Sequence, residues 1–95
     1  MLMKQETKNM SRIDCLVLAS LEKRSLSLTG ITHKIASSNI KKLPTRIGIH
    51  ARLKKLNDQG FVVFSWQEGQ KIYTITNKGF LELKQFINQL VRLAA

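Results

Sequence analysis

Basic side chains gather in the middle of this 95-residue chain, and the chemistry open to them is phosphate binding. Residues 31–60 hold seven lysines and arginines and a single acidic residue, Asp58. The flanking segments 1–30 and 61–95 each contribute only +2 to the net charge of +10. Lysine and arginine neutralise phosphates and release the counterions condensed on a nucleic acid. A concentrated patch of this kind indicates a polyanionic partner, with nucleic acid favoured over an anionic membrane surface.

The stretch 45–55 carries side chains that can read the edges of base pairs. Three apolar residues at helical spacing turn one face inward: Ile49, Leu53 and Leu56. The outward face begins with Arg46 and Ile47, which suit guanine and the thymine methyl group respectively. Lysines further along the helix suit phosphates. The candidate DNA-binding residues of this helix are Thr45, Arg46, Ile47, His50, Ala51, Lys54 and Lys55.

Polar residues on both sides of this helix are further candidates for phosphate contact. Those in the preceding helix and connector are Lys34, Ser37, Ser38, Lys41 and Lys42. Lys71, just after a turn further along the chain, is the candidate in the second half. Exposed serine hydroxyls and lysine ammonium groups commonly donate to phosphate oxygens.

Residues for catalysis or metal binding are scarce. The single cysteine, Cys15, lies among apolar neighbours, and the two histidines are His33 and His50. No set of nucleophile, base and acid is recognisable, and glycines do not cluster into a phosphate-binding loop. We therefore expect no enzyme, no cofactor, no metal site and no small-molecule ligand. Apolar runs are too short to span a membrane, and the first ten residues do not resemble a secretory signal, so we expect a cytoplasmic protein, in the nucleoid or, for a viral or plasmid protein, in its host.

Hydrophobic periodicity predicts four helices and a hairpin in the order α-α-α-β-β-α, a mainly α fold with a small β-hairpin. Ser11 and Asp14 form a capping box before a helix over 12–23. Thr29 is predicted to cap the second helix, and the third is predicted over 44–59, with Pro44 in its first turn and Gly60 as its stop.

The second half of the chain changes from helical to alternating periodicity. Strands are predicted over 61–66 and 71–75, joined by a turn over 67–70. We expect Phe61 or Phe64 in the core and Trp66 at the base of the hairpin, although these aromatic residues with Tyr73 could instead stack on single-stranded bases. Thr76 or Asn77 is predicted to cap the last helix.

The last helix has more apolar surface than a small core can cover. This excess predicts pairing with a second copy of the chain. The candidate dimerisation residues are Leu83, Phe86, Ile87, Leu90 and Val91. The expected organisation is a flexible arm over 1–10, one domain over 11–79, and a C-terminal helix over 80–95 that belongs to that domain and carries the dimer contacts.

Three segments resemble the PadR and MarR families of regulators. Arg52–Val62 (RLKKLNDQGFV) is similar to their junction between recognition helix and wing, and Tyr73–Gly79 (YTITNKG) to the end of their wing. Cys15–Ile35 resembles the first helix of PadR proteins leading into the second. The resemblance spans nearly all of 11–95 in the same order. It implies a winged helix-turn-helix and a transcriptional regulator that binds double-stranded DNA as a homodimer.

The same basic surface is also compatible with three alternative functions. A non-specific architectural protein would bind all duplexes equally. A winged helix can also bind RNA or an acidic protein surface, because a fold does not fix a function.

Overall fold

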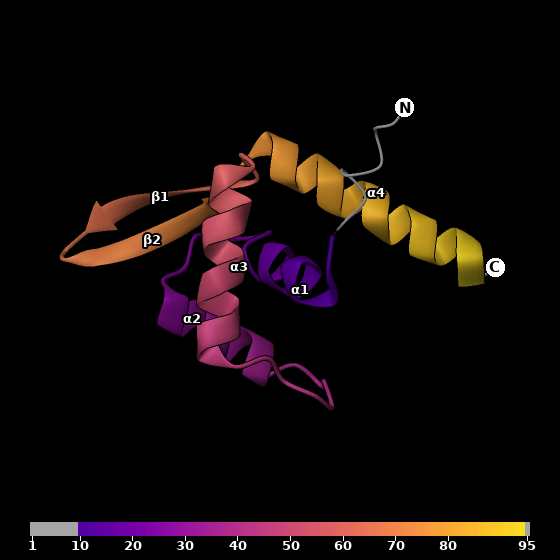
Figure 1. Ribbon diagram of the computed structural model, residues 1–95, viewed down its shortest axis with the longest axis horizontal. Coiled ribbons are helices and arrows are strands. Elements are labelled where there is room, and N and C mark those ends of the chain that lie inside the picture. Colours follow the sequence, from indigo (N-terminus) through magenta and orange to yellow (C-terminus); the bar gives the residue numbers. More distant parts are fainter. Residues whose placement is uncertain (1–9, 95) are drawn as a thin grey trace.

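The computed structural model describes residues 10–94. The elements are α1 (Arg12–Ser20), α2 (Leu28–Ala36), α3 (Arg46–Asp58), β1 (Val62–Gln67), β2 (Gln70–Ile75) and α4 (Asn77–Ala94). This order confirms the predicted α-α-α-β-β-α fold. The hairpin of β1 and β2 extends from one side of the helical body, and α4 extends from the other (Figure 1). The arm predicted over 1–10 lies outside the described residues except for Met10, which packs half-buried against the core.

A hydroxyl side chain caps the start of every helix. Ser11 and Asp14 form the predicted capping box at α1, and Thr76, one of the two predicted caps, serves α4. The cap of α2 is Ser27 rather than the predicted Thr29. The prediction was wrong because the chain stays extended through Leu26, which pairs with Tyr73 of β2, and then turns at once into the helix.

The ends of α1 and α3 also differ from the prediction. α1 ends at Ser20, three residues early, which leaves a turn that carries the chain back toward the hairpin. α3 begins at Arg46, because Thr45 caps it through the backbone N–H of Gly48, so Pro44 precedes the helix instead of lying in its first turn. Gly60 follows the helix with φ +82°, as a helix stop requires.

The hairpin has a tighter turn than expected. The pairing runs from Val62 opposite Ile75 to Gln67 opposite Gln70, so only Glu68 and Gly69 form the turn. Both turn residues have positive φ, 52° and 81°, as two-residue turns between twisted strands require. Pairing therefore extends one residue further toward the tip than predicted, to Gln67 and Gln70.

The core lies between the three-helix body and the base of the hairpin. Ile49, Leu53 and Leu56 of α3 are buried as predicted and meet apolar side chains of the other elements. Those partners are Val17, Leu18, Leu21, Ile31, Ile35, Val62, Tyr73 and Leu83. Each such side chain contributes about 1.5–3 kcal/mol by its removal from water. The buried face of α3 is thus fixed, and the opposite face is left for function.

The apolar stripe of α4 begins inside this core. Leu83 is fully buried in its own protomer, so its predicted place in a dimer interface is wrong. Ile87, Leu90 and Val91 continue the stripe at helical spacing and are exposed, while Phe86 is half-buried. Among the described residues, none of the helices is long and apolar enough to cross a membrane.

Candidate nucleic-acid interface

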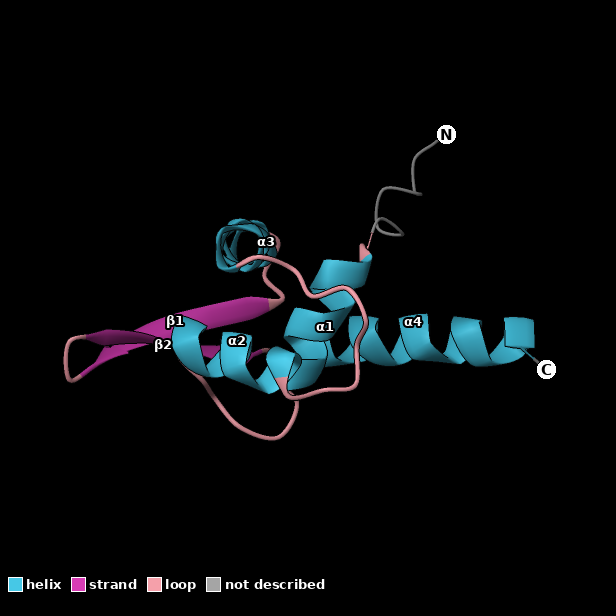
Figure 2. Cartoon of the chain, turned by 90° about the horizontal axis from the view of Figure 1, so that it is seen from below, coloured by secondary structure: helices cyan, strands magenta, loops and turns pink. Residues whose placement is uncertain are grey.

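α3 presents an uncovered face at the edge of the molecule. Figure 2 shows this helix nearly end-on, with the other helices on one side of it only. Every residue predicted for contact from this helix is exposed: Thr45, Arg46, Ile47, His50, Ala51, Lys54 and Lys55. Ile47 has 83% of its surface exposed, which is unusual for a large apolar side chain. The face combines positive charge with apolar side chains and has one carboxylate, Asp58, at its C-terminal end.

Arg46 is held at the N-terminal end of α3 by the preceding helix. Its Nη2 donates a hydrogen bond of 3.2 Å to the Thr29 hydroxyl in the first turn of α2. The other N–H groups of the guanidinium have no protein acceptor among the described residues. The contact directs an arginine fork outward at the junction of the two helices.

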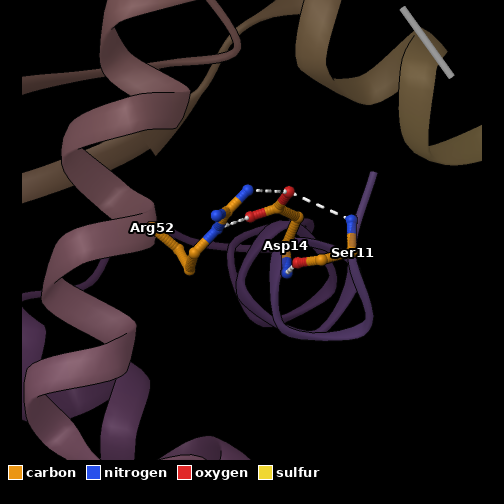
Figure 3. Close-up of polar contacts among 3 residues, drawn as sticks. All are labelled: Ser11, Asp14 and Arg52. Carbon is orange, nitrogen blue, oxygen red and sulfur yellow. Dashed lines mark hydrogen bonds and ion pairs between the residues drawn. The ribbon is translucent and has the colours of Figure 1, made fainter. Parts of the chain in front are cut away.

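Arg52 lies on the same helix but serves a structural purpose (Figure 3). Its Nε donates to Asp14 Oδ1 at 2.6 Å and its Nη2 to Asp14 Oδ2 at 2.7 Å. The Asp14 carboxylate is buried and also accepts the backbone N–H of Ser11 at 3.1 Å. The hydrogen bonds to Asp14 raise the pKa of Arg52 further above its ordinary value. This bidentate pair fixes α3 on α1 and removes one arginine from the cations available to a partner.

The sequence alone did not reveal this ion pair. The capping box at Ser11 and Asp14 was predictable because its partners are three residues apart. Arg52 is 38 residues from Asp14, and only the crossing of α1 and α3 brings them together. The helical position of Arg52, at the border between the face of Ile49, Leu53 and Leu56 and the outward face, is the one sequence signal that could have suggested an internal partner.

The connector between α2 and α3 brings some of its predicted residues together. Ser37 and Ser38 both donate their hydroxyls to the Lys34 carbonyl, at 2.9 and 3.1 Å, and so complete the end of α2. Both hydroxyl protons are engaged in these bonds, so only the hydroxyl oxygens of the two serines remain as acceptors. The Arg12 guanidinium donates to the Lys42 carbonyl at 2.8 Å and ties the connector to α1. The side chains of Lys34, Lys41 and Lys42 are exposed.

The hairpin places its aromatic residues differently from the prediction. Trp66 pairs with Lys71 one position from the turn, so it lies near the tip and its predicted place at the base is wrong. The strand bounds explain the error, because β1 leaves the helical body at Val62 and Trp66 comes near its far end. Phe61 packs half-buried against the core, whereas Phe64 stays 37% exposed. The Lys71 Nζ lies 4.3 Å from the centroid of the Phe64 ring.

The described part of the chain contains neither a metal-binding cluster nor an activated thiol. No group of three or more His, Cys, Asp or Glu residues comes together there to hold a metal ion. Burial raises the pKa of the Cys15 thiol, and the negative charge of the Asp14 carboxylate raises it to a smaller extent. A thiol of this kind stays protonated at neutral pH and is a poor nucleophile.

Several solved structures have the same arrangement of helices and hairpin. No protein-family model and no curated protein sequence matches the chain. Bacillus subtilis PadR in complex with operator DNA is 30% identical over 82% of this chain, with a TM-score of 0.73, and the chain spans 48% of that PadR chain. A PadR family transcription regulator from Clostridium difficile is 24% identical, with a TM-score of 0.64, covering 88% of this chain and 94% of the regulator.

This chain has the winged-helix fold of PadR-type regulators. A complex structure of hsRosR gives the same fold at a TM-score of 0.79 and 15% identity, over 93% of this chain and 79% of that one. In winged-helix terms α3 is the recognition helix and the β1–β2 hairpin is the wing. The resemblance found in the sequence to PadR-type proteins is therefore confirmed.

Proposed function

We propose that this winged helix is a transcriptional regulator that binds double-stranded DNA sequence-specifically, with α3 in the major groove. The observation that carries the proposal is the composition of the exposed face of α3. Its N-terminal half exposes arginine, isoleucine, histidine and alanine, which together can donate to bases and contact thymine methyl groups. B. subtilis PadR, which is 30% identical over the aligned part, was solved with operator DNA, and this supports the same partner here.

The lysines around α3 are assigned to the DNA backbone. Lys54 and Lys55 lie two to three turns along the helix, where a recognition helix leaves the bases and approaches phosphates. Lys34, Lys41 and Lys42 on one side and Lys71 on the other extend the positive surface. Asp58 closes the row at the C-terminal end of α3, away from the bases.

The functional unit that we propose is a dimer formed through α4. The stripe that begins at buried Leu83 continues through half-buried Phe86 to exposed Ile87, Leu90 and Val91, and none of residues 10–94 covers the exposed part. A second copy would cover it and present two recognition helices to half-sites about 34 Å apart, one turn of DNA. Occupancy of such a site then blocks or recruits RNA polymerase.

Replacement of Arg46 tests the assignment of base reading to α3. A duplex selected from a random library by the wild-type protein is compared with a scrambled duplex of equal length. Arg46→Ala is expected to reduce the discrimination between them by about 5–150-fold, the value of a bidentate arginine–guanine contact. Folding should be intact because Arg46 is exposed.

Arg92→Ala is the matched control, since it removes the same charge from the last turn of α4. Its discrimination should equal that of the wild type. A wild-type protein that binds every duplex equally would make the chain an architectural protein. Undiminished discrimination by Arg46→Ala would show that the N-terminal end of α3 does not read bases.

A further inference from the structure

The wing has one face that is buried at its base and aromatic toward its tip. Cross-strand partners and alternate residues share a face, so Val62, Phe64 and Trp66 of β1 lie with Lys71 and Tyr73 of β2. Val62 and Tyr73 are 0% and 4% exposed in the core, whereas Phe64 and Trp66 are 37% and 65% exposed. The exposed aromatic residues therefore lie on the side of the hairpin that packs against the helical body.

That face borders a groove between α3 and the wing. Two adjoining hollows share His50, Lys71 and Tyr73 as lining residues and together run along α3. The helix side is lined by Arg46, His50 and Lys54, and the wing side by Phe64, Trp66 and Lys71. The single carboxylate, Asp58, lines only one of the two hollows. We call this the wing groove.

The side chains of the wing groove are held in place by contacts with one another. Phe64 and Trp66 meet edge to face, with centroids 6.4 Å apart and planes at 89°. The Lys71 Nζ lies 4.3 Å from the Phe64 centroid and 5.8 Å from that of Trp66. These contacts place the Lys71 ammonium group directly beside the exposed aromatic rings. A positive rim around exposed aromatic rings fits a polymer in which anionic and apolar groups alternate.

The sugar–phosphate strand of DNA is such a polymer. We propose that the wing groove holds one strand of the bound duplex, with Trp66 and Phe64 packed against deoxyribose and Lys71 paired with a phosphate. The inference rests on the DNA binding proposed above, which already assigns Lys71 to the backbone, and adds an aromatic contact of Trp66 and Phe64 with the sugar. Because every nucleotide has the same sugar, the aromatic contact supplies affinity without sequence preference. α3 reads the bases while the wing groove fixes the strand beside them.

Trp66→Ala tests the proposal against Val63→Ala as its control. Val63 is on the same strand and 49% exposed, but it lies on the opposite face, opposite Thr74. Loss of about 60 Å² of apolar contact predicts a loss of affinity of about tenfold for each engaged protomer. Trp66→Ala should lose this factor equally for the selected and the scrambled duplex, and Val63→Ala should lose none. The melting temperatures of both variants verify their folding.

Salt dependence separates the apolar contact from the ionic one. Trp66→Ala should leave the slope of log affinity against log salt unchanged, since no phosphate is released. Lys71→Gln should make that slope shallower by about 0.9 for each protomer.

Three results would overturn the proposal. The first is equal affinity of Trp66→Ala and wild type for duplexes that the wild type binds. The second is a loss confined to the selected sequence, because Trp66 would then contact bases. The third is a loss seen with single-stranded DNA alone, because Trp66 would then stack on unpaired bases. Failure of the wild-type protein to bind any duplex would instead refute the proposed function itself.

Discussion

The affinity of this winged helix for duplex DNA is expected to fall by about 10³–10⁵-fold between 50 and 200 mM salt if a bound dimer neutralises about 6–10 phosphates. About three to five such contacts in each protomer supply that number, and the lysines available for them are Lys34, Lys41, Lys42, Lys54, Lys55 and Lys71. Their side chains are exposed or half-buried. Arg52 is not among them, because its Nε and Nη2 both donate to the Asp14 carboxylate. The measurement is a binding titration by fluorescence anisotropy at several salt concentrations.

Lysine variants locate the source of this salt dependence. Lys54→Gln should make the slope shallower by about 0.9 for each protomer in contact. Lys84→Gln removes the same charge from α4, where the ammonium already pairs with Glu22 at 3.1 Å, and should leave the slope unchanged. An affinity that falls less than tenfold over the same range of salt would contradict the phosphate-binding role of the basic surface.

Gly79→Ala is expected to destabilise the fold by about 3–5 kcal/mol, through overpacking and loss of a helix cap. A Cβ atom at this position would lie 2.2 Å from the Phe61 carbonyl oxygen, a backbone atom. That carbonyl also accepts the N–H of Thr76 at 3.0 Å, and Thr76 caps α4 through the Gly79 N–H. The whole junction of α3, wing and α4 must therefore move to admit a methyl group. Domains of this size have about 5–15 kcal/mol of stability in total, so much of it would be lost.

Gly48→Ala is the matched control for this substitution. Gly48 is also the third residue of its helix and donates its N–H to the cap, Thr45. There the new Cβ would meet only the Thr45 hydroxyl oxygen, at 3.1 Å, and that side chain can move. The better helix propensity of alanine offsets the cost, so the expected change is within about 1 kcal/mol. Urea unfolding followed by circular dichroism measures both variants. Equal stability of Gly79→Ala and wild type would show that the close approach at Phe61 is not required.

The sequence predicted the features of this fold that depend on near neighbours. Helix caps at Ser11 and Thr76 need only a hydroxyl three residues before a free N–H. The buried face of α3 needs only apolar side chains at intervals of three and four residues. These local patterns were enough to orient the recognition helix and to name its exposed residues.

Features that depend on distant partners were missed. The cap at Ser27 depends on the pairing of Leu26 with Tyr73, which only the folded hairpin provides. Trp66 lies near the tip of the wing because the buried end of β1 is Val62, and the alternating strand pattern alone does not show which end of the strand meets the core. The ion pair of Asp14 and Arg52 joins helices that are far apart in the sequence. The wing groove likewise exists only after α3 and the hairpin have packed on one core.

The exposed face of α3 and the adjoining wing groove are together expected to bind duplex DNA. The most direct test is a titration of the isotope-labelled protein with the selected duplex, followed through its backbone amide NMR signals. We expect the largest shifts over residues 45–55 and 66–71, with smaller shifts near Lys34, Lys41 and Lys42. Shifts concentrated in α4 or on the Val63 face of the wing, with α3 unchanged, would contradict it.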